Sequence, residues 1–227
     1  MTWDDDGYLI SKKKYNENSL IVEFFTKNHG KVTGLIFGAT SKKIKSYLLL
    51  GNFFKINFNS KNDNRTGYFK VEISKIITPF FLYDNLKLSF LIYSMNLIQI
   101  LNVENQSNIK IFYLLNNIFD ILNNDNWIQN FIYWELKILK ELGYYIDFKE
   151  YVLNKNINGK NQYIVKSTSN KIIPDFLIKQ NQMFSNNKDL YIGLKLVGDF
   201  LDKSILKPNN IPFPTSRIRL LNLISNL

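Results

Sequence analysis

The chain has 227 residues and carries 29 lysine and arginine residues against 19 aspartate and glutamate residues, a formal net charge of +10. This excess favours a polyanionic partner, such as nucleic acid or an anionic membrane surface. The sequence contains no cysteine, which excludes disulfides, thiolate zinc sites and cysteine nucleophiles, and its apolar fraction of 45% is enough for a real core.

Neither the N-terminus nor the most apolar stretch of the chain indicates a membrane protein. The N-terminal stretch MTWDDDGYLI is acidic and lacks the apolar core of a signal peptide. The most apolar stretch, residues 86–103, contains Lys87, Ser94 and Asn102, so it is too polar for a membrane span and suits a buried helix. We therefore expect a soluble, cytoplasmic protein without a membrane partner.

Residues 1–78 have the pattern of short β-strands. Apolar and polar residues alternate over residues 54–58 and 69–73, which is the period of a half-buried strand. The polar loop at residues 60–67 suits a hairpin connection between these two. The other strand candidates are residues 8–12, 19–26 and 31–38, and residues 40–50 fit a short helix. Five short strands with excess basic charge predict an OB-type β-barrel.

The lysines of this segment are the strongest candidates for phosphate contact. A cluster of ammonium groups neutralises the nucleic-acid backbone and releases counterions without reading sequence. The candidates are Lys12, Lys14, Lys31, Lys42, Lys43, Lys45 and Lys55. The alternative is an ordinary solvated charged face. Four aromatic residues lie among these lysines and have either base stacking or core packing as their role: Tyr8, Phe37, Tyr47 and Phe53.

After Thr78-Pro79 the apolar period becomes helical. One apolar stripe runs from Trp127 to Leu142 and another from Leu190 to Ile205, each at the spacing of a single helix face. Further helices are expected at residues 85–101, 108–122 and 216–225, whereas 144–188 is polar and weakly patterned, with extended pieces near 163–166. The predicted fold class is α+β, with a barrel at 1–78 and a mainly α-helical domain at 79–227.

Few residues offer catalytic chemistry. Asp4, Asp5 and Asp6 point in different directions on an extended chain, so we expect a solvated terminus and not a metal site. His29 is the single histidine, and its Asn-His-Gly context predicts a hairpin turn without a catalytic triad. No phosphate-binding loop of the G-x-x-x-x-G-K-[ST] type occurs. We expect no catalytic residue, no metal and no cofactor.

Glycines and aromatic residues of the helical half have structural interpretations. The aromatic stripe around Phe131 and Trp134 suits core packing. Gly143 fits a helix C-cap. Gly193 and Gly198 stand inside a helical pattern, where glycine costs about 1 kcal/mol, and this indicates close packing against another helix.

Three blocks of sequence resemble the RecO family of bacterial recombination mediators. The first is a W-x-D-x-G opening at residues 3–7, followed by E-x-S, T-x-x-x-G and G-A-x-S-K-K up to Lys43. The second is WELKILKELGYYIDF, residues 134–148. The third is GLKLVGDFLDK, residues 193–203, with the proline–arginine stretch IPFPTSRIRLL at 211–221. The resemblance extends over essentially the whole chain.

The resemblance implies a non-catalytic DNA repair protein with an N-terminal OB domain and a C-terminal helical domain. It implies binding of single- and double-stranded DNA, annealing of complementary strands, and partnership with RecR and the single-stranded-DNA-binding protein SSB. Through these partners RecA would be loaded onto SSB-coated DNA. Some relatives carry a four-cysteine zinc module, but here its first position is Tyr151 and cysteine is absent, so zinc does not carry over.

The SSB tail is acidic with an apolar tip, so its receptor should be an apolar groove with a basic rim. Candidates on the helical half are Lys110, Lys137, Lys140, Arg217 and Arg219, although each also suits an ordinary surface charge. Two alternatives to a DNA-binding mediator stay open. One is a metal-dependent nucleic-acid enzyme using Asp5, Asp6, Glu17 or Glu23. The other is a protein–protein adaptor whose basic charge is incidental.

Overall fold

The computed structural model describes residues 1–61, 66–150, 152–157, 160–166, 172–179 and 186–226. Tertiary contacts divide the chain into two compact units, Met1–Asn117 and Ile118–Leu227. The change of secondary structure expected near residue 78 is present, but contacts group the first helices with the strands. The assignment of domains to 1–78 and 79–227 stays a prediction.

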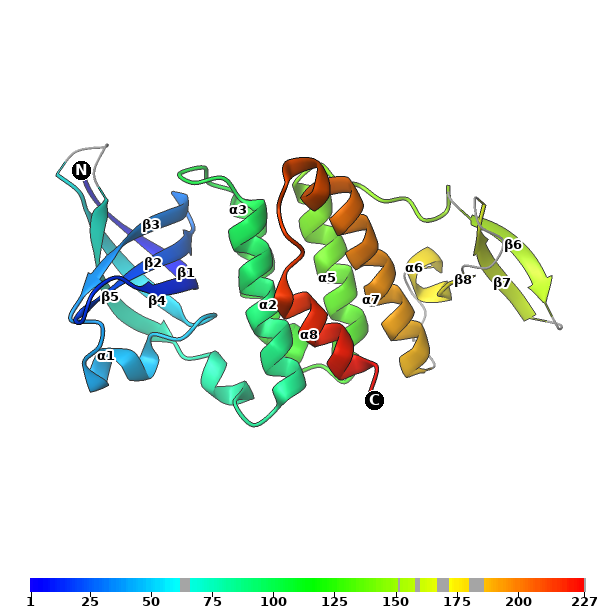
Figure 1. The fold of residues 1–227 in the computed structure, drawn as a ribbon, viewed down its shortest axis with the longest axis horizontal. Coiled ribbons are helices and arrows are strands. Elements are labelled where there is room, and N and C mark those ends of the chain that lie inside the picture. Colours follow the sequence, from blue (N-terminus) through cyan, green and yellow to red (C-terminus); the bar gives the residue numbers. More distant parts are fainter. Residues whose placement is uncertain (62–65, 151, 158–159, 167–171, 180–185, 227) are drawn as a thin grey trace. The chain divides into compact units, whose positions relative to one another are not determined.

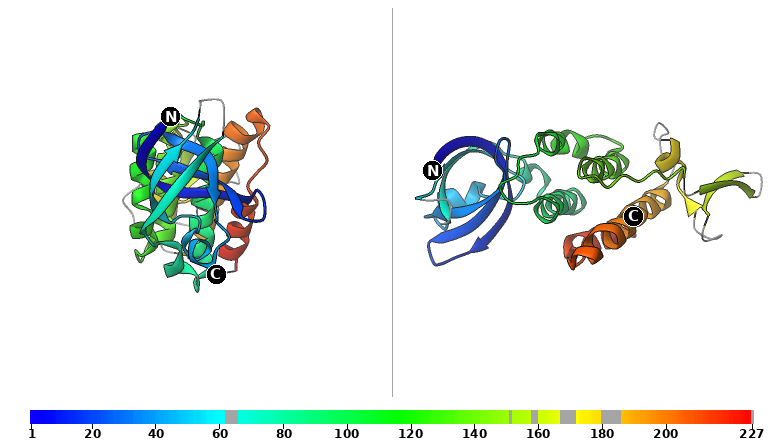
Figure 2. Two further views of the ribbon diagram at one scale, coloured as in Figure 1. Left: turned by 90° about the vertical axis from the view of Figure 1, so that its left-hand side faces the viewer. Right: turned by 90° about the horizontal axis from the view of Figure 1, so that it is seen from above.

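Five strands form a closed barrel in the order β1-β2-β3-β5-β4 (Figures 1 and 2). The strands are β1 Thr2–Lys14, β2 Ser19–Thr26, β3 Gly30–Phe37, β4 Phe53–Asn59 and β5 Gly67–Lys75. Four of the pairings are antiparallel, and a short parallel pairing of β3 with β5 closes the ring. The predicted barrel is confirmed. The polar loop expected between β4 and β5 includes residues 62–65, which lie outside the described residues.

Two glycines permit the barrel to close. Gly34 of β3 is paired with Gly67 of β5. A Cβ atom on Gly34 would lie 2.6 Å from the Phe69 ring, and one on Gly67 would lie 2.2 Å from the Phe58 ring. Because both rings belong to the barrel core, side chains at these glycines would displace core packing.

The barrel core is apolar and is covered at one end by helix α1, Lys42–Tyr47. Inward residues such as Phe24, Phe54 and Phe69 are buried and meet edge to face. Ile44 and Tyr47 of α1 pack against this cluster, so the helix lies across the end of the barrel (Figure 1). The short helix expected within residues 40–50 is confirmed.

Two helices complete the first unit. Residues Thr78–Phe81 form a 3-10 turn, after which α2 spans Asn85–Leu101 and α3 spans Ile109–Asn116. Helix α2 packs against β1 and β2. The Asp84 side chain caps α2 by accepting from the backbone N–H groups of Leu86 and Lys87, as an N-cap residue does.

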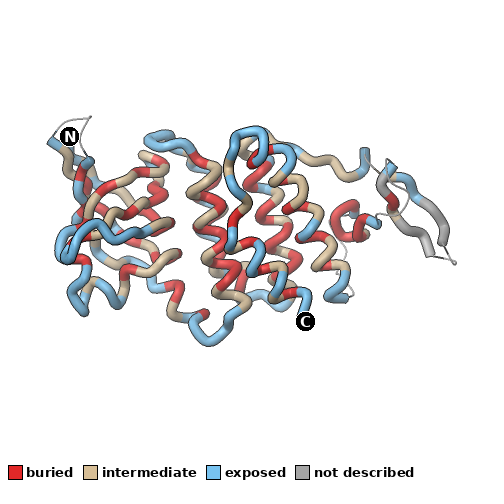
Figure 3. Tube along the Cα trace, viewed as in Figure 1, coloured by how far each residue is buried: buried red, intermediate tan, exposed pale blue. Residues whose placement is uncertain are grey.

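The second unit is mainly helical. Its helices are α4 Ile118–Leu122, α5 Trp127–Glu141, α6 Asp175–Lys179, α7 Asn187–Leu201 and α8 Thr215–Ile224, with a π-helical turn at Asp202–Leu206 and a 3-10 turn at Lys207–Asn209. Both predicted apolar stripes are buried over most of their length, on α5 and on α7 with its π-helical extension (Figure 3). The helix expected at 108–122 is divided into α3 and α4.

The weakly patterned segment holds a small antiparallel sheet of β6 Val152–Ile157, β7 Lys160–Val165 and β8 Ile172–Ile173. The glycines behave as predicted. Gly143 follows α5 with φ +89°, and a Cβ atom on Gly193 would lie 2.6 Å from the Phe176 ring.

One prediction for the N-terminus is wrong. The strand β1 begins at Thr2 and not near residue 8, so the three aspartates lie on a barrel strand. The Asp5 side chain is only 1% exposed and contacts His29. It accepts hydrogen bonds from the backbone and side-chain nitrogens of Asn28 as well. These donors keep the carboxylate inside the fold, and His29 does occupy the expected turn between β2 and β3.

Candidate nucleic-acid interface

An apolar row crosses the outer side of the barrel. In the strand registers Ile21 of β2 is opposite Leu35 of β3, and Leu35 is opposite Tyr68 of β5. Residues opposite one another share a face of the sheet. Phe37 lies two residues beyond Leu35 on the same face, and its ring is 5.8 Å from the Tyr68 ring. We call Ile21, Leu35, Phe37 and Tyr68 the aromatic strip.

The aromatic strip is open, whereas α2 covers the other ends of β2 and β3 on this face. Phe37 is 58% exposed and Tyr68 is 36% exposed. Towards the other end of the same strands, the C-terminal turn of α2 covers the face, because Gln99 contacts both Glu23 and Lys31. Large exposed aromatic residues next to basic residues suit base stacking on a single strand.

Lysines gather at the end of the barrel that α1 covers. The turn between β1 and β2 is joined to the turn after β3 by a hydrogen bond of 3.1 Å from the Ala39 N–H to the Asn18 carbonyl. This bond holds the end of β1 near the start of α1. The exposed lysines of these two elements are Lys12, Lys13, Lys14, Lys42, Lys43 and Lys45, which we call the basic end. Helix α1 begins at Ser41, whose hydroxyl caps it.

The ammonium group of Lys12 is less available to a ligand than those of the neighbouring lysines. It is paired with Val22, whose side chain is in the barrel core, so Lys12 lies on the inner side of β1. Its Nζ donates to the Leu48 carbonyl at 2.7 Å. Burial, and then repulsion from Lys45, lower the pKa of Lys12. The Lys12 and Lys45 ammonium groups therefore repel one another, and a bound anion would relieve this repulsion.

Lys31 and Lys55 are placed less favourably for phosphate than the sequence suggested. Lys31 donates from Nζ to the Gln99 carbonyl at 2.9 Å, in the last turn of α2. Lys55 of β4 is opposite Asp6 on one side and Glu72 on the other. The two flanking acids offset the charge of Lys55, so these three residues together carry one net negative charge.

Three interface residues were missed by the sequence reasoning. Lys13 is opposite Ile21 and therefore continues the row of the aromatic strip, whereas Lys12 and Lys14 belong to the other side of β1. Tyr68 contacts Phe37, and Tyr15 in the following turn is 58% exposed. The alternation of side chains along β1 could have identified Lys13, because only every second residue of a barrel strand faces outwards.

Of the four interleaved aromatic residues, only Phe37 is exposed. Tyr8 is buried and its hydroxyl donates to Asn116 Oδ1 at 2.8 Å. Phe53 packs against Tyr8, with ring centroids 4.8 Å apart. Tyr47 packs against the barrel core. Core packing is therefore the role of these three.

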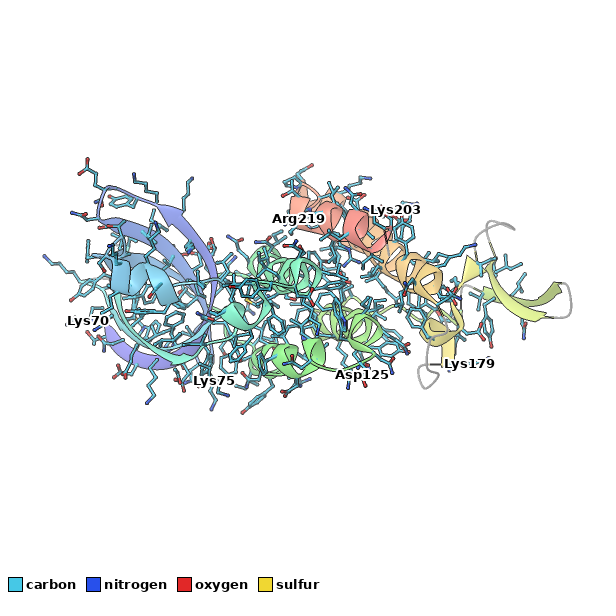
Figure 4. The ribbon with its side chains drawn as sticks, turned by 90° about the horizontal axis from the view of Figure 1, so that it is seen from below. Lys70, Lys75, Asp125, Lys179, Lys203 and Arg219 are labelled. Atoms are coloured by element: carbon cyan, nitrogen blue, oxygen red, sulfur yellow. The ribbon has the colours of Figure 1, made fainter. Side chains whose placement is uncertain are left out.

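The candidate partner-binding residues are distributed over both units. Lys110 lies on α3 in the first unit, and Lys137 and Lys140 lie exposed on α5 in the second. The Lys140 ammonium is 5.4 Å from the centroid of the Tyr145 ring. Arg219 is exposed on α8, and Figure 4 marks its position.

Arg217 differs from the surface position expected of it. Its side chain is fully buried and its Nη1 donates to Glu135 Oε2 at 2.8 Å. The guanidinium satisfies a buried carboxylate on α5, which explains why it is not presented to a partner.

The described parts of the chain contain no group of three or more histidine, cysteine, aspartate or glutamate side chains that could hold a metal ion. No helix among them is long and apolar enough to cross a membrane.

Comparison with known proteins identifies the family. A model of the N-terminal domain of recombination protein O matches residues 1–80, and a model of its C-terminal domain matches residues 82–188. The protein named DNA repair protein RecO from Wolbachia sp. subsp. Drosophila simulans (strain wRi) is 26% identical over 98% of this chain and 100% of its own length. Those from Ehrlichia chaffeensis (27%; 99% and 98% covered) and Cereibacter sphaeroides (25%; 99% of each covered) are similar. The chain therefore belongs to the RecO family of DNA repair proteins.

Proposed function

We propose that this protein binds single- and double-stranded DNA, anneals complementary strands and, together with RecR, helps RecA to load onto SSB-coated DNA. The observation that supports this proposal best is the open aromatic strip beside the basic end of the barrel. The family membership supports the repair context. The finer activities and partners follow from the resemblance of the sequence to the family.

The mechanism on the barrel is charge neutralisation with base stacking. Lysines of the basic end contact phosphates and release counterions, while Phe37 and Tyr68 offer rings to unstacked bases. Two strands repel each other through their phosphates, so a surface that neutralises one strand lowers the barrier to pairing with its complement. None of these steps needs a nucleotide or a metal.

We also propose that the second unit binds the acidic SSB tail. A shallow groove of about 380 Å³ runs along α8 and is lined by Ile218, Leu223 and Arg219, among others. Ile218 is 48% exposed, and exposed apolar side chains that line a groove often mark a docking site. An apolar floor with one arginine suits a peptide that ends in an apolar residue and a carboxylate.

Annealing of complementary oligonucleotides in EDTA tests the central proposal. We expect wild-type protein to accelerate annealing, and Phe37→Ala/Tyr68→Ala protein to lose most of this activity while remaining folded. Phe80→Ala, which removes another exposed aromatic residue of the same unit, is the matched control. Acceleration that requires Mg²⁺, or cleavage of the strands, would favour the alternative of a metal-dependent enzyme. Absence of DNA binding would favour the adaptor.

A further inference from the structure

A second site lies at the end of the barrel that α1 does not cover. There the start of β1, the β2–β3 turn, the end of β4 and the start of β5 surround a pocket of about 570 Å³, a volume in the range of small-ligand sites. The pocket is lined by the aromatic residues Trp3, His29 and Phe58, and by polar residues that include Thr33 and Glu104. The proposed function makes no use of this pocket.

Three rings lead from the barrel core into the pocket. Phe58 is buried and stacks on Trp3 with centroids 4.8 Å apart. Trp3 is half-buried and stacks on His29 with centroids 3.9 Å apart and an interplanar angle of 10°. The His29 side chain is 31% exposed. The imidazole ends this stack and lines the pocket, where its face away from Trp3 can take another planar ring.

The imidazole is held in place by Asp5. Its Oδ2 is 2.8 Å from Nδ1 of His29, and the carboxylate also accepts from the Asn28 N–H at 2.8 Å. Because Asp5 is buried, these bonds fix the β2–β3 turn and the plane of the imidazole before any ligand arrives. A site that is organised in advance binds with a smaller entropic cost.

The polar lining suits the edge of a base better than a phosphate. Glu104 accepts from the Thr33 hydroxyl at 2.6 Å, which holds the loop after α2 against β3. The charged groups among the lining residues that the structure describes include this carboxylate and the Met1 ammonium, which donates to the Ser60 carbonyl at 2.7 Å. The described lining therefore offers a phosphate no lysine or arginine side chain. A carboxylate and the Asn105 amide instead match the amino and carbonyl groups of a base.

The pocket is close to the aromatic strip along a single strand. Thr33, Leu35 and Phe37 are alternate residues of β3 and share its outer face, so Thr33 at the pocket and Phe37 of the strip are separated by roughly 13 Å of strand. Lys27 directly precedes the lining residue Asn28, and Lys61 directly follows the lining residue Ser60, so both lysines are near the pocket in the sequence.

We propose that this end pocket takes one unstacked nucleobase of a bound single strand, which stacks on His29 while its phosphates stay outside. The proposal rests on the proposed function, since it assumes that single-stranded DNA occupies the barrel. It adds a contact to bases, and not to the backbone, at the end opposite the basic end.

The test compares the affinity for an oligothymidylate with the affinity for an abasic strand of the same length. The ratio of the two affinities isolates the contribution of bases. We expect His29→Ala to lower this ratio about fivefold or more, which is the effect of losing one stacked base. His29→Phe keeps a ring and should retain most of the ratio. Lys55→Ala, on the mixed-charge side of the barrel, is the control and should leave the ratio unchanged.

A crosslinking experiment on wild-type protein keeps the proposal testable if His29→Ala does not fold. A strand that contains 5-iodouracil is irradiated in the complex, and the crosslinked residues are mapped by mass spectrometry. Crosslinks at Trp3 or His29 support the pocket. Crosslinks confined to Phe37 and Tyr68, or an unchanged ratio in folded His29→Ala, would overturn it while leaving DNA binding intact. A wild-type protein that binds neither strand would instead remove the proposed function itself.

Discussion

Arg217 of α8 donates from Nη1 to Oε2 of Glu135 on α5 at 2.8 Å, and both side chains are fully buried. The Nη2 of Arg217 donates in addition to the Leu194 carbonyl of α7 at 2.7 Å. A Cβ atom on Gly198 would lie 3.3 Å from Nε of Arg217, so the glycine leaves room for the guanidinium. One arginine thus joins three helices of the second unit. These residues come from two of the sequence blocks that resemble the RecO family.

Removing this arginine should destabilise the second unit strongly. Arg217→Met leaves Glu135 buried without its cation, and we expect the free energy of unfolding to fall by about 3–5 kcal/mol. Urea unfolding, followed through the fluorescence of Trp127 and Trp134, measures the loss. Arg219→Met is the matched control, because Arg219 is exposed and should contribute within about 0.5 kcal/mol.

Replacing both partners should recover much of this loss. The double variant Arg217→Met/Glu135→Leu removes the charges together, and apolar replacements of a buried pair are often tolerated. We therefore expect the double variant to be more stable than Arg217→Met alone. A double variant that loses the sum of the two single effects would show that the pair is not coupled.

The lysines of the basic end should determine the salt dependence of DNA binding. For Lys42→Ala/Lys43→Ala/Lys45→Ala we expect weaker binding and a flatter plot of log affinity against log salt. Removing one lysine–phosphate pair reduces the magnitude of the slope by about 0.7 to 0.9. Lys55→Ala removes one lysine that is flanked by Asp6 and Glu72, and its slope should stay near that of wild type. Equal changes per lysine in both variants would move the interface away from the basic end.

The pKa of Lys12 offers a local probe of the same surface. Burial and then Lys45 lower this pKa from its ordinary value of 10.5. Between the lowered pKa and 10.5 the unfolded chain binds more protons at Lys12 than the folded chain, so this group makes stability rise with pH in that window. Lys45→Gln removes the repulsion and should raise the pKa, although burial keeps it below 10.5. Titration of the Lys12 side chain by NMR measures the change, and an unaltered pKa would refute the repulsion between the two ammonium groups.

The sequence was sufficient for the five barrel strands and for the longer helices, but not for the small sheet of β6, β7 and β8 or for α6. Alternation over residues 54–58 and 69–73 predicts β4 and β5, and the stripe around Phe131 and Trp134 predicts α5, because burial of one face imposes its period on the sequence. The ends of the strands and helices were harder to predict. The strand β1 begins at Thr2, since Asp5 is satisfied by Asn28 and His29 within the fold, and a partner so distant in sequence leaves no local pattern.

The candidate site was predictable in composition but not in geometry. A count of lysines gives the basic character of the barrel, yet only the register separates Lys13 on the outer face from Lys12 on the inner one. Lys31 and Arg217 look like free cations in the sequence, but each satisfies an acceptor on a helix far along the chain. Closure of the barrel brings Tyr68 next to Phe37, and this contact makes Tyr68 part of the aromatic strip.

The last prediction separates the two units by function. If α8 binds the acidic SSB tail, Arg219→Glu should abolish recruitment to SSB-coated DNA, because the carboxylates of the tail would meet a negative charge. Binding to naked DNA should be nearly unchanged, since the basic end is intact. Deleting the tail from SSB should have the same effect on wild-type protein.

The variant Lys42→Ala/Lys43→Ala/Lys45→Ala should show the reverse pattern, with weak binding to naked DNA and retained binding to SSB alone. Parallel loss on both substrates in Arg219→Glu would mean that one surface serves both partners.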